Sequence, residues 1–440
     1  MNNVLEKDKL KEKDFQAILN QVQRHMASYH ANLLKDSNMK NVTEQLKACI
    51  KKYLVREQMV ASNCSLDETV DWIMREMTSF SVLDPYLDTK RTDIEEINVN
   101  AWNAVKVHFS DGSVKNVEHF FSPEHCENII RRLLSKESTL VLDKSRPIVR
   151  GHLNSKIRIT VMGEGVIDKN IGIAASIRIV NPKNLGKRDF IEKGTANEQM
   201  ITLLVTLFLH GSSMCITGET GSGKTTFMNF LLQQIPDESR IFTIEEDVRE
   251  FNLIRTDQDG TVLNNVVHTV TRKSDDPAKE ISQERLLEAA MTMDPDVICV
   301  AEMKGREAFA AEEAAITGHT VITTTHADSC RSTYYRMADL CQTTTNIDYK
   351  LLVEKSKSAF PIVVFIKKCK DKVRRILEIT ECIKKDDGST EIKTLFRYRK
   401  GKFEKVANPS TKIRRQLEAD EVSQDIIDMI FEEVYICAKC

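Results

Sequence analysis

A glycine-rich stretch near the middle of the chain carries the clearest chemistry in the sequence. From Gly218 to Thr225 the residues GETGSGKT match the spacing G-x-x-x-x-G-K-S/T. In such loops backbone N–H groups turn towards phosphate oxygens, the lysine reaches the β- and γ-phosphates, and the last hydroxyl binds Mg²⁺. We therefore predict a loop that binds the phosphates of a nucleotide, formed by Gly218, Glu219, Thr220, Gly221, Ser222, Gly223, Lys224, Thr225 and Thr226.

A carboxylate follows an apolar run later in the chain. Glu302 comes directly after VICVA, and a carboxylate just beyond a buried strand is placed to orient the water that attacks the γ-phosphate. Most phosphate-loop proteins have an aspartate for Mg²⁺ one position earlier, where this chain has Ala301. We therefore expect Mg²⁺ to depend on Thr225, on Glu302 through water, and on another acid.

The stretch TIEED supplies candidates for that other acid. Glu245, Glu246 and Asp247 follow the apolar run RIFTI. We predict that at least one of them faces the metal and its water. Glu245 and Glu246 are preferred over Asp247, and the sequence leaves the choice between those two open.

Two histidines flank the run TVITTT. His319 and His326 lie seven residues apart, so they cannot share one face of a strand as i, i+2 neighbours do, and a zinc pair is not expected. His326 follows the end of the predicted strand, which suits a γ-phosphate sensor. His319, next to Gly318, is either a sensor or a structural residue.

The pattern of apolar residues divides the chain into regions. SLDETVDWIMREM begins with Ser65 and Glu68 at capping-box spacing, which indicates a helix, and Asp111-Gly112 between alternating residues indicates a hairpin. Later strands and helices alternate, which is typical of a doubly wound α/β domain with its chemistry at the carboxyl ends of the strands. The predicted regions are 1–88 (helical), 89–181 (mixed α/β), 182–195 (linker) and 196–440 (α/β phosphate-loop domain, with a C-terminal extension from about 385).

Composition narrows the classes of function. The 440 residues include 63 Lys+Arg and 65 Asp+Glu, a net charge of −2, so the chain lacks the basic excess of most nucleic-acid binders. No apolar run approaches the roughly 18 residues that a membrane span requires, and the first residues do not form a signal peptide. We expect a cytosolic protein whose 11 cysteines are reduced. The terminal CAKC is not expected to bind zinc, because a structural site needs four ligands.

Taken together, these segments resemble the type II/type IV secretion ATPases, and most closely the branch that powers Tad (tight adherence) pili. GETGSGKTT resembles that family's phosphate loop, and TIEEDVREF resembles its acidic box. DPDVICVAEMKGREA resembles its atypical Walker B motif, and TGHTVITTTHADS its histidine box. Upstream, DIEEINVNAWNAVKVHFSDGS and AASIRIVNPK resemble its N-terminal α/β domain. The resemblance covers about residues 85–385.

The resemblance implies a RecA-like motor domain, preceded by a mixed α/β domain and an N-terminal helical region. It also implies catalytic roles for residues that the motifs contain: Glu302, Glu245, Glu246, His326, His319 and, from the upstream domain, Arg178. Arg158 is a weaker match than Arg178. Asp294 and Lys304 stand where the family usually has arginine, which leaves open which arginines act between subunits.

The implied function is hydrolysis of ATP, with Mg²⁺, by a cytoplasmic ATPase that forms a homo-hexameric ring. Such a ring works at the inner face of the cell membrane, on an inner-membrane platform protein, and powers pilus assembly or secretion. Two alternatives stay open: a nucleic-acid translocase on the same core, which low aromatic content (6%) and the net charge disfavour, and a nucleotide-gated adaptor that does not hydrolyse ATP. A small-molecule kinase would need an acceptor pocket that the sequence does not indicate.

Overall fold

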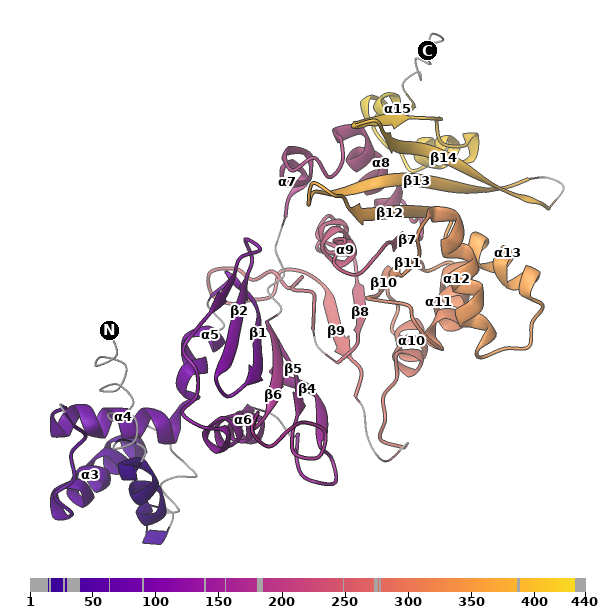
Figure 1. Cartoon of the computed structure of the whole chain (residues 1–440). Helices are drawn as coiled ribbons and strands as arrows, with labels where there is room; N and C mark the ends of the chain where they lie inside the picture. The colour runs from indigo at the N-terminus through magenta and orange to yellow at the C-terminus, as the bar shows by residue number, and fades with distance from the viewer. Residues whose placement is uncertain are drawn as a thin grey trace. The chain divides into compact units, whose positions relative to one another are not determined.

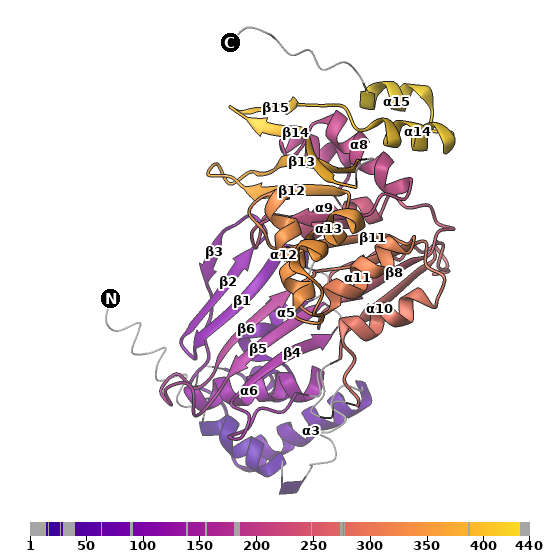
Figure 2. The ribbon, with the colours of Figure 1, turned by 90° about the vertical axis from the view of Figure 1, so that its right-hand side faces the viewer.

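A computed structural model describes residues 15–431 except 16, 27, 30–39, 63, 89–90, 138–139, 155, 180–184, 248, 273–275, 277 and 386–387. The chain divides into two compact units, Met1–Asn181 and Pro182–Cys440. Figures 1 and 2 show both units from perpendicular directions. Each unit has a hydrophobic core of its own.

The first unit begins with helices that pack on one another. Residues 17–26 are helical and are followed by α3 (Lys40–Arg56) and α4 (Leu66–Thr78). The predicted capping box of α4 is confirmed, because the Ser65 N–H donates to the Glu68 carboxylate at 2.7 Å and the Glu68 N–H donates to the Ser65 hydroxyl at 3.2 Å. Apolar side chains at helical spacing fill the space between the helices: Leu19, Val22, Leu46, Ile50, Leu54, Val70 and Ile73.

A six-stranded antiparallel sheet completes the first unit, in the order β3-β2-β1-β6-β5-β4. The predicted hairpin at Asp111-Gly112 is confirmed by the pairing of β2 with β3, and helix α6 contributes Ile129, Ile130 and Leu133 to the core beneath the sheet. The elements are η1 (Ser81–Leu83), α5 (Asp84–Leu87), β1 (Ile94–Ala101), β2 (Ala104–Phe109), β3 (Val114–Asn116), α6 (Pro123–Glu137), β4 (Ile148–Asn154), β5 (Ile157–Met162) and β6 (Ala174–Ile179).

Buried polar contacts join α4 to α6, the helix that packs on the sheet of the first unit. His125, on α6, lies with Nε2 2.8 Å from the carboxylate of Glu76, on α4, and the Ser81 hydroxyl donates to the same carboxylate at 2.9 Å. The Arg132 guanidinium donates to the backbone carbonyls of Glu76 and Met77 at 2.7 and 3.1 Å. These bonds satisfy carbonyls at the end of α4, which the helix itself leaves unpaired.

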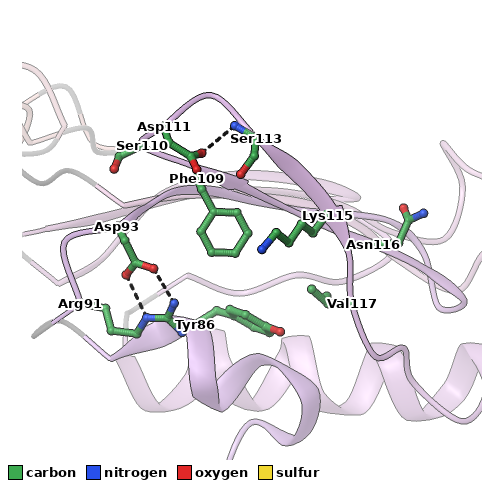
Figure 3. Close-up of a pocket in the computed structure, with 10 residues that line it drawn as sticks. All are labelled: Tyr86, Arg91, Asp93, Phe109, Ser110, Asp111, Ser113, Lys115, Asn116 and Val117. Atoms are coloured by element: carbon green, nitrogen blue, oxygen red, sulfur yellow. Dashed lines mark hydrogen bonds and ion pairs between the residues drawn. The ribbon is translucent and has the colours of Figure 1, made fainter.

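A pocket of about 640 Å³ opens on the first unit between α5 and the β2–β3 hairpin (Figure 3). The rings of Tyr86 and Phe109 line it, with the Lys115 ammonium 5.2 Å from the Phe109 ring centre. Two further charged residues of the lining pair with each other, since Arg91 donates to both carboxylate oxygens of Asp93, at 3.0 and 2.6 Å. The pocket contains none of the predicted site residues.

The second unit is built on a nine-stranded sheet in the order β15-β14-β13-β12-β7-β11-β10-β8-β9. The strands from β12 to β9 in this order are parallel, and β13, β14 and β15 continue the sheet antiparallel. The strands are β7 (Met214–Thr217), β8 (Ile241–Glu245), β9 (Val266–Val270), β10 (Val297–Val300), β11 (Thr320–Thr325), β12 (Ile362–Lys368), β13 (Arg374–Lys384), β14 (Thr390–Arg399) and β15 (Lys402–Lys405).

Helices cover both faces of this sheet (Figures 1 and 2). Side chains of α7, α8, α9, α14 and α15 form the core on one face, and those of α10, α11, α12 and α13 form the core on the other. The predicted doubly wound α/β domain is therefore confirmed. The helices are α7 (Lys187–Glu192), α8 (Glu198–Leu209), α9 (Lys224–Leu232), α10 (Gln283–Met291), α11 (Glu307–Ile316), α12 (Cys330–Gln342), α13 (Tyr349–Ala359), α14 (Thr411–Ala419) and α15 (Gln424–Phe431).

One predicted region, the linker 182–195, differs from the structure. The stretch 182–195 contains helix α7, and the Phe190 ring packs 5.3 Å from Phe227 and 5.0 Å from Phe230, centre to centre. Phe190 is therefore part of the core of the second unit, and the described part of this stretch is not a linker. The stretch from about 385, predicted as a C-terminal extension of the 196–440 domain, continues the sheet of that domain, because β14 pairs with β13.

Glu312, on α11, is a carboxyl group buried in the helical layer of the second unit. The Ser356 hydroxyl, on α13, donates to it at 2.6 Å, and Lys355 and Glu313 are the charged groups near it. Burial raises the pKa of Glu312 to about 7, and the hydrogen bonds from Ser356 and Cys341 oppose this only in part. The folded state holds the Glu312 proton more tightly than the unfolded state does. The contribution of Glu312 to the free energy of unfolding therefore falls as pH rises from about 4.5 to 7 and is level above that.

We therefore expect Glu312→Gln to stabilise the protein at high pH. The amide keeps the shape and the acceptor for Ser356 but has no charge to bury, so its gain over wild type grows between pH 5 and 8 to at most roughly 3 kcal/mol. Urea unfolding at several pH values measures this. Glu288→Gln, at an exposed position of α10, is the control. A difference between Glu312→Gln and wild type that does not change with pH would contradict the prediction.

No helix among the described residues is long and apolar enough to cross a membrane. The cysteines within the described residues are free thiols, and most of them are buried. Cys437 and Cys440 of the terminal CAKC lie outside the described residues.

Candidate nucleotide-binding site

The predicted phosphate loop connects β7 to α9 at the carboxyl edge of the parallel sheet. Gly218, Gly221 and Gly223 have φ angles of 148°, 75° and 99°, which L side chains rarely adopt. At Gly218 a β-carbon would also stand 2.0 Å from the carbonyl oxygen of Ile366, so only glycine fits there. The Ser222 hydroxyl is buried and has no hydrogen-bond partner among the described residues, which fits a loop that binds an oxyanion.

Lys224 lies at the first position of α9 and points back into this loop. Its ammonium group donates to the carbonyls of Gly218 and Glu219 at 2.8 and 3.1 Å. Burial lowers the pKa of Lys224, and the nearby Glu302 carboxylate opposes that shift. A cation held by weak neutral acceptors inside the loop can exchange them for phosphate oxygens, which are stronger acceptors.

Glu302 and His326 meet beside Lys224, although they follow different strands. His326 Nε2 lies 2.8 Å from the Glu302 carboxylate, and His326 Nδ1 lies 3.3 Å from the Lys224 ammonium and 3.1 Å from the Gly218 carbonyl. Because a carboxylate can only accept, Nε2 carries a hydrogen and donates to Glu302. Nδ1 accepts from the ammonium in the neutral ring and donates to the Gly218 carbonyl in the doubly protonated ring. Glu302 is 34% exposed, so water can reach it.

Threonines at the end of β11 hold the segment that carries Glu302. The hydroxyl of Thr324 donates to the Ala301 carbonyl at 2.7 Å, and that of Thr325 donates to the Met303 carbonyl at 2.9 Å. The Met303 N–H in turn donates to the Thr324 carbonyl at 2.8 Å. The run TTT before His326 is the sequence signal for this role.

Glu245 is fully buried and organises the acidic stretch. Its carboxylate accepts from the backbone N–H groups of Glu250 and Phe251, from the Thr243 hydroxyl at 2.9 Å, and lies 3.3 Å from His268 Nδ1. A carboxylate engaged in this way stabilises the loop after β8. The structure therefore does not present Glu245 to solvent at the phosphate edge.

Glu246 is the more exposed acid of this stretch, with a side chain 25% exposed, and it forms an ion pair with Lys304. At position 304 the family that the sequence resembles usually has arginine. Lys304 therefore keeps a positive charge beside the acidic stretch. Asp247 is buried and has a φ angle of 60°. Of the two preferred acids, the geometry favours Glu246 for the metal and its water, and that role stays a prediction.

Within the second unit, His319 does not lie at the phosphate loop. Arg178 belongs to the first unit. His319 precedes β11, at the opposite end of that strand from His326, and its N–H donates to the Ala314 carbonyl at 3.1 Å. Arg178 lies in β6 of the first unit, where it pairs in register with Arg158 and Glu96. Their roles towards a nucleotide stay predictions.

The residues at this edge fit Mg²⁺ that is held mainly by phosphates and water. Thr225 follows Lys224 in the first turn of α9, and the partly exposed Glu302 follows β10, which β11 separates from β7. Within the described ranges, no three His, Cys, Asp or Glu side chains are grouped to hold an ion by themselves. Mg²⁺ in nucleotide sites is bound by few protein ligands and keeps several waters, so the small set here is sufficient.

The fold and this loop define a P-loop nucleotide-binding protein with a RecA-like core. A family model described as "Type II/IV secretion system protein" matches residues 99–433. The chain therefore belongs to the type II/IV secretion system ATPase family, which confirms the resemblance at the level of the family. The Tad branch is not distinguished by this match.

Named relatives belong to type IV secretion systems. The chain is 35% identical over 162 residues to type IV secretion system protein PtlH of Bordetella pertussis, covering 36% of this chain and 46% of PtlH. It is 39% identical over 124 residues to VirB11 of Brucella suis, covering 28% and 33%. The chain therefore spans less than half the length of these relatives.

Other comparisons extend over more of the chain at lower identity. An uncharacterized protein of Bacillus anthracis is 23% identical over 343 residues, which are 76% of this chain and 73% of that protein. Among solved structures, the Legionella pneumophila ATPase DotB covers 69% of this chain and 81% of its own, with a TM-score of 0.49 and 17% identity.

Proposed function

We propose that the protein hydrolyses ATP, with Mg²⁺, and that this reaction powers a type II/IV secretion machine or the assembly of a Tad-type pilus. The main support is the series of contacts from Lys224 through His326 to Glu302, which joins a phosphate-binding cation to a solvent-accessible carboxylate. Family membership supports a role in secretion. The motifs quoted above support the Tad branch.

In the proposed reaction each residue has one task. Lys224 exchanges the carbonyls of Gly218 and Glu219 for β- and γ-phosphate oxygens. Glu302 orients the attacking water, and His326 fixes the carboxylate and lies where it can respond to the γ-phosphate. Bound Mg²⁺ neutralises charge on the phosphates.

We further propose that six copies form a closed ring at the cytoplasmic face of the cell membrane, docked on an inner-membrane platform protein. The named relatives are type IV secretion system proteins, which supports a role within a larger machine, and the six-membered ring is proposed from the family resemblance. The net charge of −2 supports a protein partner over nucleic acid. Arg178 is the proposed arginine that reaches a nucleotide from the first unit.

Mixing subunits tests the ring. If six sites are obligatorily coupled, a one-in-six fraction of Glu302→Gln subunits leaves only about a third of rings fully wild type, and activity falls more steeply than dilution. ATPase activity is measured after subunit exchange confirmed by mass. Wild type mixed with Lys350→Ala, an exposed position on α13, is the control. A decline in proportion to the mutant fraction would reject a coordinated ring and keep the ATPase assignment.

A further inference from the structure

The hairpin formed by β12 and β13 lies directly beside the phosphate loop. β12 is the parallel neighbour of β7, with Phe365 paired to Thr217, the last residue before the loop. The chain therefore continues past the end of β7 through Ile366 and Lys367. The loop backbone packs against this continuation, since Gly218 has no room for a β-carbon beside the Ile366 carbonyl.

Two cations of the hairpin contact the outside of the loop. Arg374 Nε donates to the Gly221 carbonyl at 3.0 Å, and its Cδ would lie 3.1 Å from a β-carbon at Gly223. Lys367 Nζ lies 3.4 Å from the Glu219 carboxylate. The hairpin therefore holds the loop on the side away from its phosphate-facing N–H groups.

A donor on the Gly221 carbonyl acts on the internal hydrogen bond of the loop through the peptide bond. The peptide that carries this carbonyl also carries the N–H of Ser222, and hydrogen bonds in series polarise one another. A charged donor on the oxygen therefore strengthens that N–H, which in this structure donates to the Glu219 carbonyl at 3.2 Å and closes the loop's own turn. Fixing the loop before binding also lowers the entropic cost of ordering it around the nucleotide.

We propose that Arg374 is a positioning residue that holds the phosphate loop in its binding conformation and so sets the affinity for ATP and ADP. This inference rests on the proposed nucleotide-binding function. Arg374 belongs to the antiparallel part of the sheet, so the C-terminal strands contribute to a site whose recognised motifs all lie on the parallel strands.

The adjacent arginine provides a matched control. Arg375 is the next residue of β13, so its side chain points to the opposite face. It pairs with Asp371 at 2.7 Å, and its guanidinium lies 5.1 Å from the Tyr398 ring centre. Arg375→Ala removes one positive charge at nearly the same place in the sequence without touching the loop.

The test compares Arg374→Ala, Arg374→Lys and Arg375→Ala in the full chain. Fluorescent ATP and ADP analogues give Kd, steady-state hydrolysis gives KM and kcat, and thermal unfolding is followed with and without ATP. For Arg374→Ala we expect Kd and KM to rise about three- to tenfold, as for loss of one exposed charge-assisted bond, with kcat within about twofold of wild type. Arg374→Lys recovers part of the loss, and Arg375→Ala binds as wild type does.

The unfolding data separate positioning from a general loss of stability. The Tm of Arg374→Ala without ATP stays at the wild-type value, while its increase on adding ATP is smaller. Unchanged Kd in Arg374→Ala, an equal loss in Arg375→Ala, or a fall in kcat with KM unchanged would each overturn the proposal. Wild-type protein that binds ATP without hydrolysing it would overturn the proposed function alone, because the Kd comparison still decides for Arg374. Wild-type protein that binds no ATP would overturn both.

Discussion

Lys224→Ala is expected to abolish nucleotide binding, with a loss of affinity of about 100-fold or more, because the phosphates lose a fixed cation inside the loop. In the structure the Lys224 ammonium lies between two loop carbonyls and His326, and an alanine side chain makes none of these contacts. Titration with a fluorescent ATP analogue measures the effect directly, and hydrolysis should disappear with it.

The control for this variant is Lys350→Ala, which removes the same charge from an exposed helix position in the same unit. It should bind ATP as wild type does. Affinity of Lys224→Ala within a few-fold of wild type would refute the phosphate-loop assignment.

Glu302→Gln is expected to retain ATP binding and to lose turnover by a factor of about 100 to 1,000, since the amide cannot accept a proton from the attacking water. The amide oxygen can still accept the hydrogen bond from His326 Nε2, so the local geometry should survive. Binding titrations and single-turnover hydrolysis separate the two effects. Glu313→Gln serves as the control, because that glutamate is exposed on α11.

The result also decides which acid positions the water. If Glu302→Gln hydrolyses ATP at close to the wild-type rate, the water-positioning acid lies elsewhere. Glu246 is then the next candidate, because it is the accessible acid after β8.

Local spacing and one rule about sheets were enough to predict the centre of this site. The loop motif fixes its own backbone, and Glu302 and His326 follow β10 and β11, which are adjacent parallel strands. Because the carboxyl ends of parallel strands meet at one edge, their proximity could be expected before the structure was known.

The acidic stretch shows where sequence reasoning stops. Glu245 and Glu246 are equivalent by composition, and their fates depend on partners that are distant in sequence. His268 of β9 and the turn that follows Glu245 bury the Glu245 carboxylate. Glu246 instead forms an ion pair with Lys304. Arg374 was missed for the same reason, since only the placement of β12 beside β7 brings its hairpin to the loop.

The continuity of the nine-stranded sheet limits how this chain can be shortened. Ending it near residue 385 would remove the strand that pairs with β13, and an unpaired edge strand is a template for aggregation. The same cut would remove side chains from the core that also holds α9: Leu395, Phe396, Ile413, Leu417, Ile427 and Ile430. A protein truncated there should therefore be insoluble or unfolded, although every recognised nucleotide motif would still be present in it.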